Sequence, residues 1–259
     1  MPKQGFYKRT HLKNTPNMRE ITLSDYNPQW PQLFSQEAEL LKEIFGDLAI
    51  NIYHKGSTSV PNLMAKPIID ITIEVEDISK VNQLNKSLAA VGYSALGEYG
   101  MPLRRLFAKG DPHTHHLHVW DKGHDEIAKD LLFRDTLIQN AVARIGYENL
   151  KQKLGAQHRF EPDQYTMGKD RLIKEILRAE NYNGLSMVFV LHESEKQAYK
   201  NFMNEDFVQN KSLVLSQGVN FIGAIFLNEN GAVDRKVITC ANEQAEKLIA
   251  RWLETRRSQ

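Results

Sequence analysis

The stretch from His54 to Val75 reads HKGSTSVPNLMAKPIIDITIEV and carries the strongest structural signal in the chain. Its second part, from Pro67 to Val75, alternates between apolar and polar residues. The apolar set is Ile69, Ile71, Ile73 and Val75, and the polar set is Asp70, Thr72 and Glu74. Because successive side chains of a strand point to opposite faces, this pattern predicts a strand with one face in the core and one polar face.

A turn of small residues, Gly56-Ser57-Thr58-Ser59, precedes that strand. Such a turn can bring backbone N–H groups and a hydroxyl to a phosphate, since glycine allows a close approach. An aspartate on the neighbouring strand, here Asp70, can then hold a divalent cation. The combination indicates a phosphate and metal site with Ser57 and Asp70 in one cleft. The alternative is an ordinary turn beside a solvated aspartate.

The other ligands of such a metal site are less clear. Thr72 stands at the i+2 position, where a second carboxylate could share an ion with Asp70, and Glu74 lies about 13 Å from Asp70 by strand rise. In HHLHVW the residues His116 and His118 alternate with apolar ones, so we expect both on the open face beside Asp70. Imidazole suits transition metals better than magnesium. Either the metal differs, or substrate groups complete the site, or transfer chemistry has been lost.

Arg104 and Arg105 are adjacent on an expected strand. Only one of them can therefore face the sheet surface that carries Asp70. That arginine is expected to hold a phosphate through two hydrogen bonds, and its neighbour to be solvated or to cap a helix.

Hydrophobic periodicity outside this stretch predicts an alternation of helices and strands. The expected helices span residues 30–44, 81–91, 125–145, 147–160 and 166–179, and further strands span 50–54, 103–108 and 115–120. The last two strands flank a Lys-Gly-Asp-Pro turn and form an expected hairpin. Asn181-Tyr182-Asn183-Gly184 breaks the pattern and marks the expected domain boundary.

Several segments between residues 21 and 177 occur in the order typical of one family. They are TLSDYNPQWPQLFSQE, HKGSTSVPNLMAKPIIDITIEV, GY at 92–93, PLRRLF, HLHV, LLFRDTL and YTMGKDRLIKEIL. This part of the chain resembles the GrpB-like family, a branch of the nucleotidyltransferase superfamily. The resemblance implies an α/β (α+β) fold, in which helices flank a nucleotidyltransferase-like mixed sheet and a helical addition follows.

The resemblance also implies a metal-dependent nucleotidyltransferase, with Mg or Mn as the cation. It would act on a nucleoside triphosphate, or another phosphate-bearing small molecule, and an unknown small acceptor. The expected catalytic residues are Asp70 and Ser57, the expected phosphate-binding residues are Gly56, Ser57, Thr58, Lys66, Arg104, Arg105 and Lys169, and the expected metal ligands are Asp70, His116 and His118. The alternative, which Thr72 favours, is a non-catalytic nucleotide- or ligand-binding module with a degenerate metal site.

Members of the family also occur fused to dephospho-coenzyme A kinase. That kinase needs a P-loop, and the pattern Gly-x4-Gly-Lys-Ser/Thr does not occur in this chain. We therefore do not expect it to be the fused partner here.

The chain divides into three expected parts: a flexible arm over residues 1–17, the GrpB-like domain over 18–180, and a small β-α-β-β-β-α domain over 187–259. The last part has strands expected at 187–191, 213–215, 221–227 and 233–239 and helices at 193–208 and 241–255. Its α-β-β-β-α portion has the element order of a double-stranded-RNA-binding domain. Its last helix begins Ala-Asn-Glu-Gln-Ala-Glu and lacks a lysine cluster, which argues against RNA.

Amino-acid composition indicates which kinds of partner and which cellular compartment to expect. The 259 residues include 33 Lys and Arg against 32 Asp and Glu, so no overall positive field favours nucleic acid. Cys240 is the single cysteine, which excludes an internal disulfide. The polar, basic start lacks the apolar core of a signal peptide, and no uncharged apolar run has the length of a membrane helix. We therefore expect a soluble cytoplasmic protein without a membrane partner.

Overall fold

The structure is a computed structural model, and it describes residues 20–190, 200, 211–238 and 242–257. The expected arm over residues 1–17, Cys240 and the expected helix over 193–208, apart from Lys200, lie outside the described residues. In the described part of the chain, no helix is long and apolar enough to cross a membrane.

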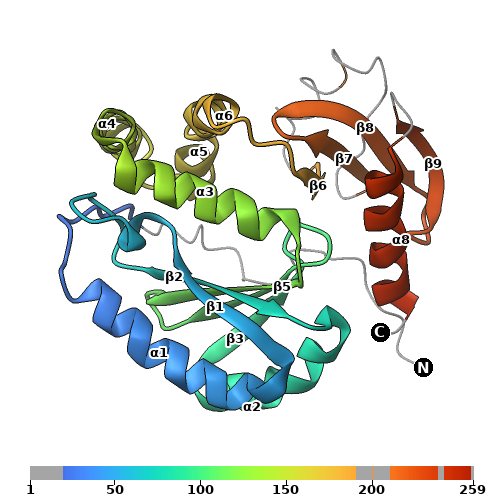
Figure 1. Cartoon of the computed structure of the whole chain (residues 1–259), viewed down its shortest axis with the longest axis horizontal. Helices are drawn as coiled ribbons and strands as arrows, with labels where there is room; N and C mark the ends of the chain where they lie inside the picture. The colour runs from blue at the N-terminus through green and yellow to red at the C-terminus, as the bar shows by residue number, and fades with distance from the viewer. Residues whose placement is uncertain (1–19, 191–199, 201–210, 239–241, 258–259) are drawn as a thin grey trace.

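A five-stranded mixed sheet forms the centre of the first part (Figure 1). Its strands are β1 (Ala49–Lys55), β2 (Ile69–Val75), β3 (Tyr93–Gly97), β4 (Arg105–Lys109) and β5 (His115–Asp121), in the order β1-β2-β5-β4-β3. β2 and β5 are parallel, and the other neighbours are antiparallel. The expected mixed sheet and the hairpin of β4 and β5 are therefore confirmed, whereas β3 was not predicted.

Helices cover both faces of this sheet. α1 (Trp30–Phe45) and α2 (Asn85–Ala90) lie on one side, and α3 (Asp125–Gln139) lies across the other (Figure 1). The apolar side chains of β2 are 0–3% exposed and pack with Leu41 and Phe45 of α1. The apolar and polar residues of β2 thus lie on opposite faces of the sheet, as predicted. We expected the polar face to be open, but α3 covers it.

The helical addition consists of α4 (Ala141–Gln157), α5 (Pro162–Met167) and α6 (Asp170–Ala179). The expected helix over 125–145 instead ends at Gln139, because the side chain of Asn140 accepts hydrogen bonds from Val142 N and Ala143 N and caps α4. The expected helix over 81–91 is also divided, into the 3-10 segment Ile78–Leu84 and α2. These differences shift element boundaries, and the mixed sheet is flanked by helices as predicted.

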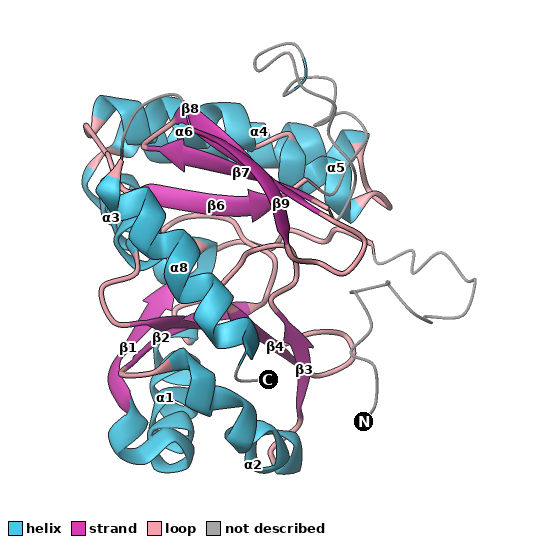
Figure 2. Cartoon of the chain, turned by 90° about the vertical axis from the view of Figure 1, so that its right-hand side faces the viewer, coloured by secondary structure: helices cyan, strands magenta, loops and turns pink. Residues whose placement is uncertain are grey.

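A separate antiparallel sheet begins after residues 181–184. It contains β6 (Leu185–Phe189), β7 (Ser212–Gln217), β8 (Asn220–Leu227) and β9 (Val233–Ile238) in that order, and α8 (Glu243–Arg257) follows it. Residues 182–257 that the structure describes are called the C-terminal unit below. Figure 2, in which this unit faces the viewer, shows α8 running from the second sheet toward the first.

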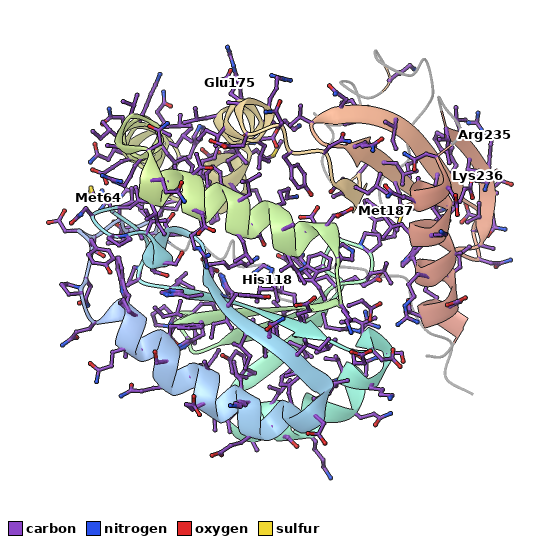
Figure 3. The ribbon with its side chains drawn as sticks, viewed as in Figure 1. Met64, His118, Glu175, Met187, Arg235 and Lys236 are labelled. Carbon is purple, nitrogen blue, oxygen red and sulfur yellow. The ribbon has the colours of Figure 1, made fainter. Side chains whose placement is uncertain are left out.

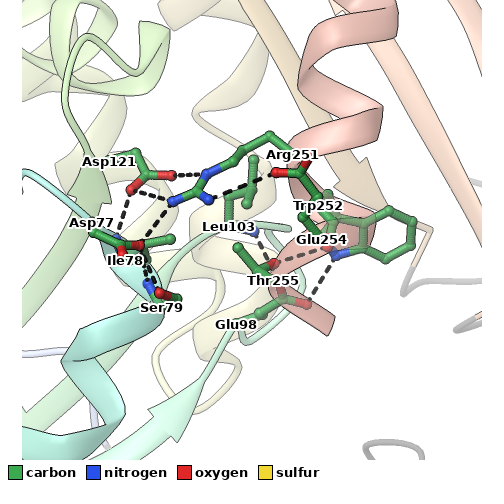
Figure 4. Close-up of polar contacts among 10 residues, drawn as sticks. All are labelled: Asp77, Ile78, Ser79, Glu98, Leu103, Asp121, Arg251, Trp252, Glu254 and Thr255. Carbon is green, nitrogen blue, oxygen red and sulfur yellow. Dashed lines mark hydrogen bonds and ion pairs between the residues drawn. The ribbon is translucent and has the colours of Figure 1, made fainter. Parts of the chain in front are cut away.

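The two sheets share one apolar core. A single cluster of buried side chains includes Tyr93 and Leu103 from the first part and Leu185, Met187 and Trp252 from the C-terminal unit. Trp252 is fully buried, and its indole N–H faces Glu98 Oε2 at 3.5 Å (Figure 4). The two sheets are therefore separate in hydrogen bonding and continuous in packing.

Candidate functional site

The centre of the site is a hydrogen-bonded pair on the polar face of the sheet. In the β2–β5 register Asp70 lies opposite His116, and His116 Nδ1 is 3.1 Å from Asp70 Oδ1. Burial on its own would raise the pKa of Asp70. The hydrogen bond from His116 and the positive charges of His116, Lys55 and Lys66 outweigh burial and lower that pKa below its ordinary value. Asp70 is therefore a carboxylate, and 29% of its side chain remains exposed.

The turn at Gly56 lies directly against this carboxylate. Gly56 has φ +70°, and a Cβ built there would lie 2.5 Å from Asp70 Oδ2, so only glycine fits. Ser57, Thr58 and Ser59 form one 3-10 turn, and both the amide and the hydroxyl of Ser59 donate to the Gly56 carbonyl. The structure thus brings the Gly56-Ser57 turn and Asp70 together, as the sequence pattern indicated.

Two hydroxyls in this turn have different surroundings. The Thr58 side chain is 1% exposed, donates to the Ile68 carbonyl at 3.2 Å and lies 3.1 Å from His54 Nε2. The Ser57 side chain lies near Tyr147 of α4 and interacts with its hydroxyl electrostatically. Thr58 therefore holds the turn together, and Ser57 connects it to the helical addition.

Lys66 and Lys169 come from distant parts of the chain and share one aromatic ring. Lys66 Nζ lies 5.4 Å and Lys169 Nζ 4.6 Å from the ring centroid of Tyr165, which is 2% exposed. Burial lowers the pKa of both lysines, and the nearby charge of Lys66 helps to bring that of Lys169 to about 8. Both ammonium groups interact with Asp70, yet neither makes an ion pair within the described part of the chain.

Two further lysines were missed by the sequence reasoning. Lys55 ends β1 next to Gly56, lies opposite Asp70 in the β1–β2 register, and contacts Asp130 of α3 at 2.5 Å. Lys151 of α4 donates to the Met64 carbonyl, and burial lowers its pKa to about 7. Its signal was available, because Lys151 shares the buried stripe of α4 with Tyr147 and Leu154 at helical spacing.

The two arginines lie on opposite sides of the sheet, as alternation requires. Arg105 is 3% exposed, and its Nε donates to Asn82 Oδ1 at 3.0 Å on the side of the 3-10 segment, away from Asp70. Arg104 donates to the carbonyls of Glu98 and Tyr99 and lies within reach of the acidic side chains of α3. Arg104 is thus the arginine on the side of the site.

A family model described as GrpB protein matches residues 20–179, more than half of the chain. The chain belongs to the GrpB family. The UPF0157 protein YqkA of Bacillus subtilis is 44% identical over 157 residues, which cover 60% of this chain and 46% of YqkA. A dephospho-CoA kinase of Mycobacterium tuberculosis is 30% identical over 153 residues, which cover 48% of this chain and 37% of the kinase. The chain therefore matches less than half the length of these two relatives.

A solved structure confirms the GrpB fold. The crystal structure of conserved protein GrpB from Enterococcus faecalis matches with a TM-score of 0.58 and 39% sequence identity, covering 60% of this chain and 94% of that one. The GrpB family model ends at residue 179, before β6, so the C-terminal unit lies outside it.

His118 of the GrpB domain lies beneath α3 (Figure 3). Its partner in the β2–β5 register is Thr72, so both expected histidines do share the face of Asp70. Burial and the charges of Lys55 and Arg104 hold the pKa of His118 well below its ordinary value, so its imidazole is neutral at pH 7. Thr72 is 1% exposed, which keeps its hydroxyl from any ligand at the Asp70 opening.

The donor set does not fit a divalent cation held by the protein alone. Among the described residues, no three His, Cys, Asp or Glu side chains are placed to share a metal ion. Asp70 is the carboxylate of the site, and it already accepts a hydrogen bond from His116 and lies within the field of Lys55, Lys66 and Lys169. Positive charge of this density repels a cation and attracts an anion.

Proposed function

We propose that the GrpB domain binds a phosphate-bearing small molecule, in the first instance a nucleoside triphosphate, at the Asp70 site. The observation that carries this proposal is the excess of lysine over carboxylate beside the Gly56-Ser57 turn. Lys66 and Lys169 are half-buried without an ion-pair partner, which is unfavourable, as their lowered pKa values indicate. A bound phosphate would supply the missing negative charge and accept hydrogen bonds from both ammonium groups.

Two further features support a nucleotide as the ligand. Glycine at position 56 leaves the turn without a side chain where a phosphate would approach, and the Ser57 hydroxyl lies next to it. One relative is named a dephospho-CoA kinase, which associates a similar sequence with nucleotide and coenzyme metabolism.

Binding is favoured over nucleotidyl transfer as the function. Transfer by the expected mechanism needs carboxylates that hold a divalent cation, and this site offers Asp70 with Thr72 at the i+2 position. A cation carried in by the triphosphate remains compatible with Asp70. Pyrophosphate release from ATP with Mn²⁺, measured on the wild type and on Asp70→Asn, separates the two functions: release that requires Asp70 would assign transfer.

Replacing Lys169 by methionine is expected to weaken ATP binding by about 10- to 100-fold, because a buried charge-assisted hydrogen bond is lost. Isothermal titration calorimetry with ATP, with and without Mn²⁺, measures this change. Lys153→Met is the matched control, since Lys153 is an exposed lysine on α4. Equal affinity of the two variants would place the anion site elsewhere.

The affinity of the wild type for ATP is expected to fall as pH rises from 7 to 9. Lys169 has a pKa of about 8, so its ammonium form predominates at pH 7 and its neutral form at pH 9. Only the ammonium form attracts phosphate, and the loss should reach about tenfold over this range. Binding measured at intervals of pH tests this. The Lys169→Met variant should show a flatter profile, and an equally steep one would assign the titration to another group.

A further inference from the structure

Helix α3 connects the Asp70 site to the rest of the molecule. Its Asp130 contacts Lys55 Nζ at 2.5 Å, and its Arg134 donates from Nη1 to the His54 carbonyl at 2.9 Å. His54 and Lys55 immediately precede Gly56. The position of α3 therefore helps to fix the backbone of His54 and Lys55, which leads into the Gly56-Ser57 turn.

The N-terminal end of α3 is held by the C-terminal unit. The Tyr182 hydroxyl donates to the Asp125 carbonyl at 3.0 Å, Leu185 N donates to Asp125 Oδ2 at 2.7 Å, and the Ser186 hydroxyl donates to Glu126 Oε1 at 2.6 Å. Glu126 is 3% exposed and also pairs with Lys129. A buried carboxylate without hydrogen-bond partners is unfavourable, so the hydrogen bond from Ser186 stabilises Glu126 in the first turn of α3.

A second connection runs through the loop over residues 98–104. Phe189 N of β6 donates to the Gly100 carbonyl at 2.9 Å, and the Trp252 indole faces Glu98. The same loop carries Arg104, whose guanidinium donates to backbone carbonyls of the loop. Burial lowers the pKa of Arg104 to about 10, and the acidic groups of α3, Glu126 first, oppose that change. The loop is thus joined to the C-terminal unit on one side and to the polar face on the other.

We propose that the C-terminal unit acts as a clamp that fixes α3 and the 98–104 loop and thereby sets the geometry of the Asp70 site. Its effect on ligand affinity rests on the proposed function; its effect on α3 does not. The clamp contacts fall in two groups: residues 182–189, which contact Asp125, Glu126 and Gly100, and Trp252, whose indole faces Glu98. Residues 183–185 also line a groove of about 920 Å³. The GrpB family model ends at residue 179, before the first of the clamp contacts, so these contacts come from outside the GrpB domain.

The test compares the full-length wild type with a Tyr182→Phe/Ser186→Ala double variant. Lys236→Ala is the control, because Lys236 lies on β9, where it pairs with Glu246 of the same unit. Amide hydrogen exchange is followed in α3 and in residues 54–60, and ATP affinity is measured by calorimetry. In the double variant we expect exchange about five- to tenfold faster in both segments and ATP binding weakened by about threefold or more, since two hydrogen bonds to α3 are lost.

Each outcome bears on a distinct statement. Unchanged exchange in α3 would overturn the clamp, and faster exchange in α3 with unchanged exchange in residues 54–60 would overturn its control of the site. If the wild type does not bind ATP, the proposed function fails while exchange in residues 54–60 still decides the clamp. Should the double variant not fold, Tyr182→Phe alone, which removes one hydroxyl, is measured against the same control.

Discussion

Replacing Trp252 by alanine is expected to lower the free energy of unfolding by about 3–5 kcal/mol, the usual cost of deleting a large core aromatic side chain. Trp252 is fully buried, and its ring makes an edge contact with Phe189 at a centroid distance of 6.0 Å. Its indole N–H also faces Glu98, a half-buried carboxyl whose pKa is raised by desolvation. The variant thus loses packing between the two sheets and leaves Glu98 without this donor. Urea denaturation followed by circular dichroism measures the change.

Trp252→Phe is the matched control, because it keeps an aromatic ring in the core and removes the indole N–H. We expect it to cost about 1–2 kcal/mol, since part of the packing and one hydrogen bond are lost. A Trp252→Ala variant as stable as the wild type would show that the C-terminal unit contributes nothing to the shared core.

Replacing Gly56 by alanine is expected to destabilise the protein by about 2–5 kcal/mol and to remove ATP binding, because a left-handed residue gains a Cβ and a close contact must be relieved. The new Cβ would lie 2.5 Å from Asp70 Oδ2 and 3.1 Å from both Asp70 Cβ and Asp70 Cγ. The carboxylate or the turn must shift, and either movement breaks the arrangement that faces the ligand. Thermal unfolding and ATP titration calorimetry together measure the two effects.

Gly123→Ala separates backbone strain from the steric contact. Gly123 also has φ +70°, but a Cβ there would meet nothing within 4 Å. Its destabilisation should reach only about 1–2 kcal/mol, the cost of the left-handed backbone, and ATP binding should persist. If both variants bound ATP equally well, the contact of Gly56 with Asp70 would have no part in the site.

The centre of the candidate site was predictable because it depends on local periodicity. Alternation puts Asp70 and Thr72 on the same face of β2, and it puts His116 and His118 on the same face of β5. The parallel pairing of β2 with β5 then places all four side chains on one face of the sheet. The role of Gly56 in the turn was predictable for a similar reason, because a short run of small residues before a strand is enough to indicate a turn.

The surroundings of that centre were not predictable, because they depend on tertiary packing. Nothing local to β2 indicates that α3 covers its polar face, yet this cover makes His118 neutral and gives Lys55 its contact with Asp130. Lys151 donates to the Met64 carbonyl, although the two residues are 87 positions apart in the sequence. The end of α3 at Asn140 was also missed, because an asparagine cap was outweighed by continuous helical periodicity.

Arg251 of α8 has a consequence for how this sequence can change over time. Its guanidinium donates to both Asp77 and Asp121, which lie 174 and 130 residues earlier in the chain, inside the GrpB segment (Figure 4). Without this arginine the two carboxylates would keep hydrogen bonds from Ile78 and Ser79 but would lose the positive charge that offsets their repulsion. Arg251 therefore ties two positions of the GrpB domain to one position outside it. The effect of a substitution at any one of these three positions is therefore expected to depend on the residues at the other two, so the C-terminal unit constrains the sequence of the GrpB domain at this contact.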